Sequence, residues 1–206
     1  MKIFLFDLET TGLPSMKSYN KYYPYQKLEY YESSRIVQLA ILVYSYDNNK
    51  FNLLEEHNYI VKPDNFKINN SDIHRITQKH AEEHGMKFKD IIDKIIPVLK
   101  ESNLIVSHNI LFDKNVLLSE LHRYDFKEAI KTIEKIPCFC TSMQTKDITK
   151  LKIKNFSEFK QPKLSELYKF LFKKNTPDNM HDASVDVKIL AECFFKLLEK
   201  KYFVLD

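Results

Sequence analysis

Two acidic residues near the start of the sequence, Asp7 and Glu9, have the type and spacing of a metal-binding pair. They follow the apolar run Ile3–Phe6, which is typical of a strand buried on both faces. Because residues i and i+2 of a strand point to the same face, both carboxylates leave it side by side. The alternative is a strand that ends in solvent, but two adjacent anions beside a buried strand repel each other strongly. The pair therefore predicts a bound cation, and oxygen ligands suit Mg²⁺ or Mn²⁺.

A third carboxylate, Asp113, lies near the expected beginning of a helix that follows a short strand. One interpretation is a favourable charge near a helix N-terminus. The other is a place in the same site, because active sites of α/β sheets gather beyond the carboxyl ends of strands. His108 and Asn109, just before this helix, are candidates for contacts to a substrate phosphate or sugar, with helix capping as the alternative.

His181 and Asp186 stand at the beginning of the last expected helix. At about 100° per residue, five residues would separate them by about 140°, so they cannot share a helical face. We therefore expect His181 in the loop before the helix and Asp186 in its first turns, with Asp182 as the helix cap. Histidine is the side chain best suited to transfer a proton near neutral pH, which makes His181 a candidate general base.

Gly12 follows the acidic pair directly and is one of only two glycines in the chain. It is expected to form a turn, since glycine tolerates conformations that other residues avoid. The functional interpretation is that backbone amides and Leu13 approach a substrate end closely at this turn.

The elements that must position these residues are an early cluster of strands followed by strands that alternate with helices. We expect strands over residues 2–9, 35–46, 56–62, 104–106 and 137–141, with a turn at 47–49. Helices are predicted from residue 71 onward and over 87–101, with Pro97 bending or shortening it, 112–121, 164–172 and 183–198. The tyrosine-rich residues 14–33 are expected to form a long loop that packs on the sheet rather than binding single strands. The economical architecture is one α/β domain over residues 1–206, a mixed five-stranded sheet flanked by helices.

The composition is that of an ordinary globular protein, with 44% hydrophobic and 29% charged residues. No apolar run approaches the roughly 20 residues that span a bilayer, and the N-terminus does not resemble a secretory signal. With three cysteines and no paired or zinc-like spacing, an intracellular protein without membrane contact is expected. The net charge of +4 is compatible with a polyanionic ligand but does not identify one.

Three segments, in order, resemble the exonuclease motifs of the DnaQ-like DEDDh family, which includes proofreading exonucleases, RNase T, oligoribonuclease and TREX-type nucleases. They are Phe6–Leu13 (FDLETTGL), His108–Asp113 (HNILFD) and His181–Asp186 (HDASVD). Two supporting segments are also similar to family sequences: Ile73–Thr77 (IHRIT) and Pro162–Leu167 (PKLSEL). Arg75 and Ser107 stand where family members often have glycine. One motif alone would be a weak match, but three in order, with all five catalytic residue types intact, are specific.

The resemblance implies an RNase H-like fold, in which the first three strands are antiparallel and the rest parallel. It also implies hydrolysis from the 3′ end, with two divalent cations, Mg²⁺ or Mn²⁺, about 4 Å apart, and release of 5′-nucleoside monophosphates. Asp7 would bridge both cations. Glu9 and Asp186 would help to hold the cation beside the attacking water, and Asp113 would support the other. His181 would deprotonate that water.

The resemblance further implies a pocket for the terminal nucleotide, lined by Leu8, Thr10, Thr11 and Leu13. Leu13 would wedge against a base. Phe112 would add an aromatic platform, with a core position on its helix as an equal alternative. His74 is another candidate for a substrate contact, although a structural role at a helix end is favoured.

Two other functions remain as alternatives. One is an RNase H-like endonuclease or strand transferase, but the Asp-x-Glu pair with His-x4-Asp is the exonuclease arrangement. The other is a catalytically silent nucleic-acid-binding module, which would normally lack at least one acidic ligand. The sequence favours single-stranded DNA 3′ ends but leaves RNA open, because no residue is recognisably reserved for the 2′-OH. Association as a homodimer, or with a separate polymerase chain, is also left open.

Overall fold

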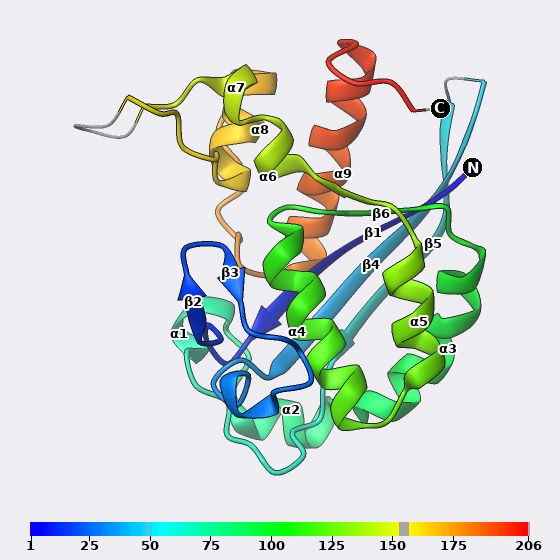
Figure 1. Cartoon of the computed structure of the whole chain (residues 1–206), viewed down its shortest axis with the longest axis vertical. Coiled ribbons are helices and arrows are strands. Elements are labelled where there is room, and N and C mark those ends of the chain that lie inside the picture. The colour runs from blue at the N-terminus through cyan, green and yellow to red at the C-terminus, as the bar shows by residue number, and fades with distance from the viewer. Residues whose placement is uncertain (49, 153–156, 206) are drawn as a thin grey trace.

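The computed structural model describes residues 1–48, 50–152 and 157–205. A five-stranded sheet forms its centre, with the strand order β5-β4-β1-β6-β7 (Figure 1). The strands are β1 (Lys2–Thr10), β4 (Ile36–Asp47), β5 (Lys50–Ile60), β6 (Leu104–Ser107) and β7 (Cys138–Cys140). β1, β4 and β5 pair antiparallel, whereas β1, β6 and β7 pair parallel. The expected mixed sheet is therefore confirmed.

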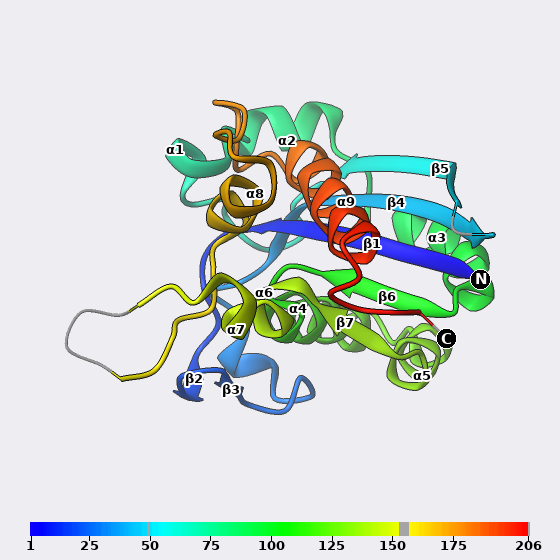
Figure 2. The same cartoon turned by 90° about the horizontal axis from the view of Figure 1, so that it is seen from above.

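Helices cover both faces of this sheet (Figures 1 and 2). The helices that build the two layers are α3 (Phe88–Glu101), α4 (Ile110–Arg123), α5 (Lys127–Lys135), α8 (Leu164–Phe172) and α9 (Ala183–Glu199). Phe4 and Phe6 of β1 pack with α3, α4 and α5, whereas Ile3 and Leu5 pack with α8 and α9. Since side chains alternate along a strand, Asp7 shares the face of Ile3 and Leu5. The central strand thus directs its acidic residues toward α9.

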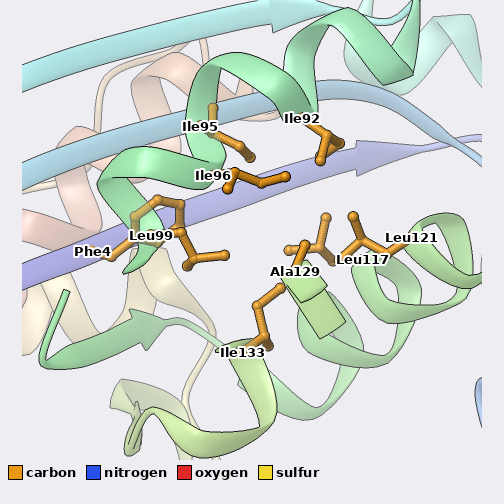
Figure 3. A pocket seen from close by; sticks show the side chains of 9 residues that line it. All are labelled: Phe4, Ile92, Ile95, Ile96, Leu99, Leu117, Leu121, Ala129 and Ile133. Carbon is orange, nitrogen blue, oxygen red and sulfur yellow. The ribbon is translucent and has the colours of Figure 1, made fainter. Parts of the chain in front are cut away.

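The layer of α3, α4 and α5 is closely packed. Figure 3 shows Phe4 of β1 meeting apolar side chains of these three helices, among them Ile95, Leu117 and Ile133. The void between them has a volume of only about 10 Å³ and an entirely apolar lining. Such a void is barely the size of one water and offers it no hydrogen-bond partner. This region is a structural core that holds α4 against the sheet.

The tyrosine-rich residues 14–33 are more ordered than the long loop expected from the sequence. They contain a short hairpin of β2 (Met16–Ser18) and β3 (Lys21–Tyr22), followed by a 3₁₀ turn over Leu28–Tyr30. Tyr31 is fully buried, which confirms packing for part of the segment. A two-residue turn and strands this short leave almost no periodic pattern, so the sequence did not indicate the hairpin.

Two strand expectations need correction. β5 begins at Lys50 rather than at residue 56, because residues 50–55 of this edge strand are mostly exposed and do not alternate regularly between apolar and polar side chains. At the expected turn, Asp47 ends β4 and Asn48 adopts a left-handed φ of 50°, while residue 49 lies outside the described residues. The strand expected over residues 137–141 is shorter in the structure, where β7 spans only Cys138–Cys140.

The helices also differ from expectation. α3 continues through Pro97, so the proline did not shorten it. The helix expected from residue 71 is a single turn, α1 (Ser71–His74), and α4 begins two residues before the expected position. α2 (Gln78–His84) and α5 were not expected, since each is short and buries few apolar residues. Two further single turns, α6 (Thr141–Gln144) and α7 (Lys146–Thr149), follow β7.

Candidate active site

The carboxyl end of β1 holds the first acidic pair. Asp7 lies opposite Ala40 and Glu9 opposite Gln38 in the pairing with β4, and the register shifts directly after Glu9. This irregularity ends the regular strand where the two carboxylates emerge. The next strand in the sheet, β6, runs parallel to β1, so its carboxyl end lies at the same edge.

Asp113 reaches that edge from the first turn of α4, as the strand-to-helix context predicted. Its side chain is 3% exposed, and the hydroxyl of Ser107, at the end of β6, donates a hydrogen bond to its Oδ2 atom. Asn109, the residue before the helix, has a left-handed conformation with a φ of 76°, and its side chain makes no capping hydrogen bond. The connection between β6 and α4 therefore turns tightly and points Asp113 back toward β1.

His181 and Asp186 occupy the positions expected from helical geometry. His181 lies before α9 with a φ of 68°, and Asp186 lies in the first turn. Asp182 is the helix cap, because its side chain accepts a hydrogen bond from the backbone amide of Ser184. The second oxygen of Asp186, Oδ1, is buried and has no hydrogen-bond partner among the described residues. That oxygen is available for a ligand.

A buried glutamine, Gln38 of β4, holds the beginning of α9 against the sheet. Its Nε2 donates to Oδ1 of Asp182 over 2.9 Å, and its Oε1 accepts from the backbone amide of Ala183 over 3.1 Å. The same Nε2 donates to Asn58 of β5. Gln38 was not predicted as a site residue, although a polar side chain within the apolar stretch 36–43 was a usable signal.

The carboxylates strongly perturb one another. Burial, together with Asp113, Asp186 and Glu9, raises the pKa of Asp7 well above its ordinary value. Burial and the charges of Asp186 and Asp113 raise the pKa of Glu9 to about 8. Burial raises the pKa of Asp113 to about 7, against the lowering effect of the Ser107 hydrogen bond. It raises the pKa of Asp186 to about 6. Burial is the largest cause of each pKa shift, and repulsion by neighbouring carboxylates adds to it for Asp7 and Glu9.

The donor set fits a divalent cation. Ligand atoms of Glu9, His181 and Asp186 lie within 4.8 Å of one another. Across the described ranges, none of the acidic residues Asp7, Glu9, Asp113 and Asp186 forms a salt bridge with a lysine or arginine. Unpaired, mutually repelling carboxylates with an orphaned buried oxygen favour a hard cation such as Mg²⁺ or Mn²⁺.

These residues line one open cleft with a volume of about 660 Å³. Its other walls come from the β2–β3 hairpin and from residues 161–165, which lead into the first turn of α8. Of the residues expected to contact substrate, the cleft is lined by Leu8, Leu13, His108, Asn109 and Phe112. Several lining residues were not predicted as site residues, among them Met16, Tyr19, Tyr22, Ser142 and Gln161.

His108 lines the cleft but uses both ring nitrogens within the protein. Its Nδ1 lies 2.9 Å from the hydroxyl of Thr141, and its Nε2 lies 2.9 Å from the carbonyl oxygen of Pro162. Burial lowers the pKa of His108 to about 4, so the imidazole is neutral near pH 7. The geometry gives His108 a structural role, joining α4, α6 and the segment before α8.

Three residues expected to contact substrate are not among those that line the cleft: Thr10, Thr11 and His74. The Thr10 hydroxyl donates to the Gly12 carbonyl, and the Thr11 hydroxyl donates to the Ser33 carbonyl. The buried His74 ring is bonded to the backbone of Asn69 and Ile76. These side chains stabilise turns of the protein, because their polar groups are satisfied locally.

Gly12 also differs from the functional interpretation. A Cβ atom at this position would lie 2.9 Å from the Ser33 carbonyl oxygen. The close approach that requires glycine is therefore to the protein's own backbone, and Gly12 does not line the cleft.

No helix in the described part of the chain has both the length and the apolar character needed to cross a membrane.

Known proteins share the family and the fold of this chain. The family model described as "Exonuclease" matches residues 4–194. A search of curated protein sequences finds no match. The zinc-bound complex of E. coli exonuclease I with single-stranded DNA has a similar fold, with a TM-score of 0.69 and 19% identity; the match covers 98% of this chain and 41% of that one. Pop2p of S. pombe, in a form with bound Mg²⁺ and Mn²⁺, has a TM-score of 0.69 and 16% identity. The match covers 97% of this chain and 84% of the Pop2p chain.

A 3′-exonuclease whose structure concerns recognition of the 3′ end of a histone mRNA stem-loop has a TM-score of 0.60 and 12% identity, covering 97% of this chain and 82% of that one. Because the three solved structures are less than 20% identical in sequence, their similarity establishes only the fold. The match to the family model establishes the family. The chain spans less than half the length of the E. coli exonuclease I chain that it matches. The family match spans most of the chain, which therefore belongs to the exonuclease family, as a DnaQ-like 3′→5′ exonuclease of the DEDDh type.

Proposed function

We propose that this chain hydrolyses the terminal phosphodiester at the 3′ end of nucleic acid and releases 5′-nucleoside monophosphates. The observation that carries the proposal is the convergence of Asp7, Glu9, Asp113 and Asp186 on one open cleft beside His181. Such an acidic cleft repels a phosphate by itself, so it needs cations before it can bind a polyanion. An open cleft with this charge suits a metal-assisted phosphodiester hydrolase.

The four carboxylates would hold two divalent cations, Mg²⁺ or Mn²⁺. When bound, these cations neutralise charge on the phosphate and make a water molecule easier to deprotonate. The oxygen-rich donor set and the unpartnered Oδ1 atom of Asp186 support this assignment. The Mg²⁺- and Mn²⁺-bound form of Pop2p, which has a similar fold, supports it as well.

His181 would accept the proton of the attacking water. Its side chain is exposed at the cleft, and its backbone amide is hydrogen bonded to Asp186, so the imidazole stays beside the carboxylates while its ring can reach solvent. Attack on the terminal phosphorus forms one P–O bond and breaks the bond to the leaving 3′ oxygen. That oxygen takes up a proton, and the proton held by His181 returns to solvent.

We favour single-stranded DNA as the substrate, with single-stranded RNA as the alternative. The complex of E. coli exonuclease I with single-stranded DNA supports the first, and the 3′-exonuclease studied with a histone mRNA stem-loop supports the second. Leu13, whose side chain is 69% exposed in the cleft, would wedge against the terminal base, and Phe112 would contact the same nucleotide.

One comparison tests this proposal. Matched oligonucleotides labelled at the 3′-terminal nucleotide, as single-stranded DNA, double-stranded DNA and single-stranded RNA, are incubated with Mg²⁺ or Mn²⁺. We expect labelled mononucleotide as the first product, released fastest from single-stranded DNA, and no reaction in EDTA. Cleavage of a circular single strand would instead indicate an endonuclease. Binding of all three polymers without metal-dependent turnover would indicate a silent binding module.

A further inference from the structure

The β2–β3 hairpin forms one rim of the cleft but has no part in the reaction proposed above. Six tyrosines lie within residues 14–33, and four of them are engaged inside the protein. The hydroxyl of buried Tyr31 donates to the carbonyl of Tyr23 over 2.6 Å. The rings of Tyr23 and Tyr30 stack with their centroids 3.6 Å apart, and Tyr25 donates to Glu134. These four tyrosines therefore stabilise the segment.

The other two tyrosines, Tyr19 and Tyr22, line the cleft. Tyr19 stands at the turn of the hairpin with 79% of its surface exposed. Among the described residues, its side chain has no hydrogen bond, ion pair or ring contact, in contrast to its four neighbours in the segment. A large aromatic ring held on the rim of a polar cleft offers an unoccupied π face to a ligand.

The hairpin that carries Tyr19 is held in place from several sides. Asn20, the second residue of the turn, has a left-handed conformation with a φ of 56°, which asparagine tolerates well. The backbone amide of Ser15 donates to the carbonyl of Tyr30. The ammonium of Lys17 lies 5.4 Å from the centre of the Tyr23 ring. A platform fixed before binding loses little conformational entropy when a ligand arrives.

The charges near Tyr19, on two lysines that border the cleft lining without belonging to it, favour a ligand with negative charge. Lys17 and Lys21 flank it on the hairpin; both are exposed, and neither forms a salt bridge within the described part of the chain. A ligand that combines a flat π surface with negative charge on either side would satisfy both features. An unpaired nucleotide in a strand has this chemistry, whereas a base inside a duplex is already stacked and paired.

We propose that Tyr19 is a stacking platform for an unpaired base upstream of the 3′-terminal nucleotide, with Lys17 and Lys21 beside the flanking phosphates. The inference rests on the proposed function, because it needs a strand whose 3′ end lies at Asp7 and Glu9. It assigns the hairpin a part in substrate choice: a strand must be unpaired at this base, so fully paired ends bind more weakly.

Binding of a short single-stranded DNA with phosphorothioate terminal linkages, which slow hydrolysis, tests the platform. The fluorescent base analogue 2-aminopurine, whose emission falls on stacking, is placed in turn at the terminal and upstream positions. We expect Tyr19→Ala to weaken binding about 5- to 150-fold, corresponding to the roughly 1–3 kcal/mol per base of aromatic stacking. In the same variant, 2-aminopurine at the upstream position that stacks on Tyr19 should regain its fluorescence. Tyr19→Phe should retain both affinity and quenching, since the ring carries the contact.

Tyr202→Ala is the matched control. Tyr202 is also an exposed tyrosine, but it lies beyond the far end of α9, whose last residue is about 20 Å from Asp186 along the helix. Unchanged affinity and unchanged quenching in Tyr19→Ala would overturn the stacking assignment, even if the wild-type protein releases mononucleotides normally. Failure of the proposed function would look different, because the wild-type protein itself would then release no mononucleotide.

Discussion

The backbone amide of His181 donates a hydrogen bond to the Oδ2 atom of Asp186 over 3.3 Å. His181 can make this contact because it lies outside α9 in a left-handed conformation, whereas Asp186 belongs to the first turn. On a continuous helix the two side chains would diverge by about 140°. The break before the helix therefore lets one short segment supply both a candidate base and a candidate metal ligand.

Neutralising Asp7 or Asp186 should abolish activity. We expect Asp7→Asn and Asp186→Asn to lower the rate of mononucleotide release more than about a thousandfold, because metal-based stabilisation of charge supplies several kcal/mol. Release from a labelled single strand at saturating Mg²⁺ measures this. Asp125→Asn is the matched control, since Asp125 is an exposed acid paired with Lys127 and its φ of 60° suits asparagine. Near wild-type rates in either site variant would contradict the assignment.

Replacing His181 should slow the reaction without eliminating it. Asparagine is the better substitute, because it tolerates the φ of 68° that would strain alanine. General base catalysis contributes about 10²- to 10⁴-fold, so His181→Asn should lose about that factor in kcat. The pH–rate profile should also change shape, since the candidate general base is gone. An unchanged profile would exclude His181 as the base.

The metal-free protein should become less stable as the pH rises. The pKa values of Glu9, Asp113 and Asp186 are raised to about 8, 7 and 6 from ordinary values of 4.5, 3.8 and 3.8. The folded state therefore binds more protons than the unfolded state, so the free energy of unfolding falls as the pH rises from about 4 to about 8. Thermal unfolding in EDTA at several pH values measures this.

Bound cations should reverse this trend by neutralising the carboxylates, so Mg²⁺ should raise the Tm more at pH 8 than at pH 6. Asp113→Asn should stabilise the metal-free protein at pH 8, because it removes one buried charge from the cluster. A metal-free Tm that is independent of pH would show that the carboxylates do not repel each other as described.

Ser107→Ala should shift the acidic side of the pH–rate profile to higher pH. The Ser107 hydroxyl donates to Asp113 and lowers its pKa, so removing the hydroxyl raises that pKa further. In the metal-free protein a smaller fraction of Asp113 is then ionised at pH 6, so cation binding, and with it activity at subsaturating Mg²⁺, should fall more at pH 6 than at pH 8. Ser119→Ala is the control, because that buried hydroxyl bonds only the backbone of its own helix. If Ser107→Ala lost activity equally at pH 6 and pH 8, the Ser107 hydroxyl would not act through the pKa of Asp113.

Gln38→Leu should weaken both stability and catalysis. The substitution keeps a similar volume but leaves the Ala183 amide without its partner, and an unsatisfied buried group costs about 1–3 kcal/mol. Chemical denaturation measures the loss. Because Gln38 holds the helix that carries Asp186, kcat should fall while the KM for a long single strand changes little. A variant with lower stability but unchanged kcat would limit Gln38 to a role in folding.

The features that the sequence alone determined are those governed by local periodicity. Asp7 and Glu9 share a face because side chains alternate along a strand. His181 must lie outside the helix, because two residues five apart on a helix point in different directions. The cap at Asp182 and the helix start before Asp113 depend on the same short-range geometry. Three such segments also sufficed to identify the family, because the order of its motifs can be read along the sequence without knowing the tertiary structure.

Only the tertiary structure decided which groups remain free for a ligand. His108 stands within a motif, yet Thr141 and Pro162, 33 and 54 residues away, use both of its nitrogens. Gln38 reaches Asp182 across 144 residues. Neither partner follows from spacing, because a hydrogen bond depends on distance in space, and chain connectivity leaves that distance open. The same reason separates Tyr19 from the other tyrosines of its segment: the fold buries or bonds four of them and leaves Tyr19 exposed at the cleft.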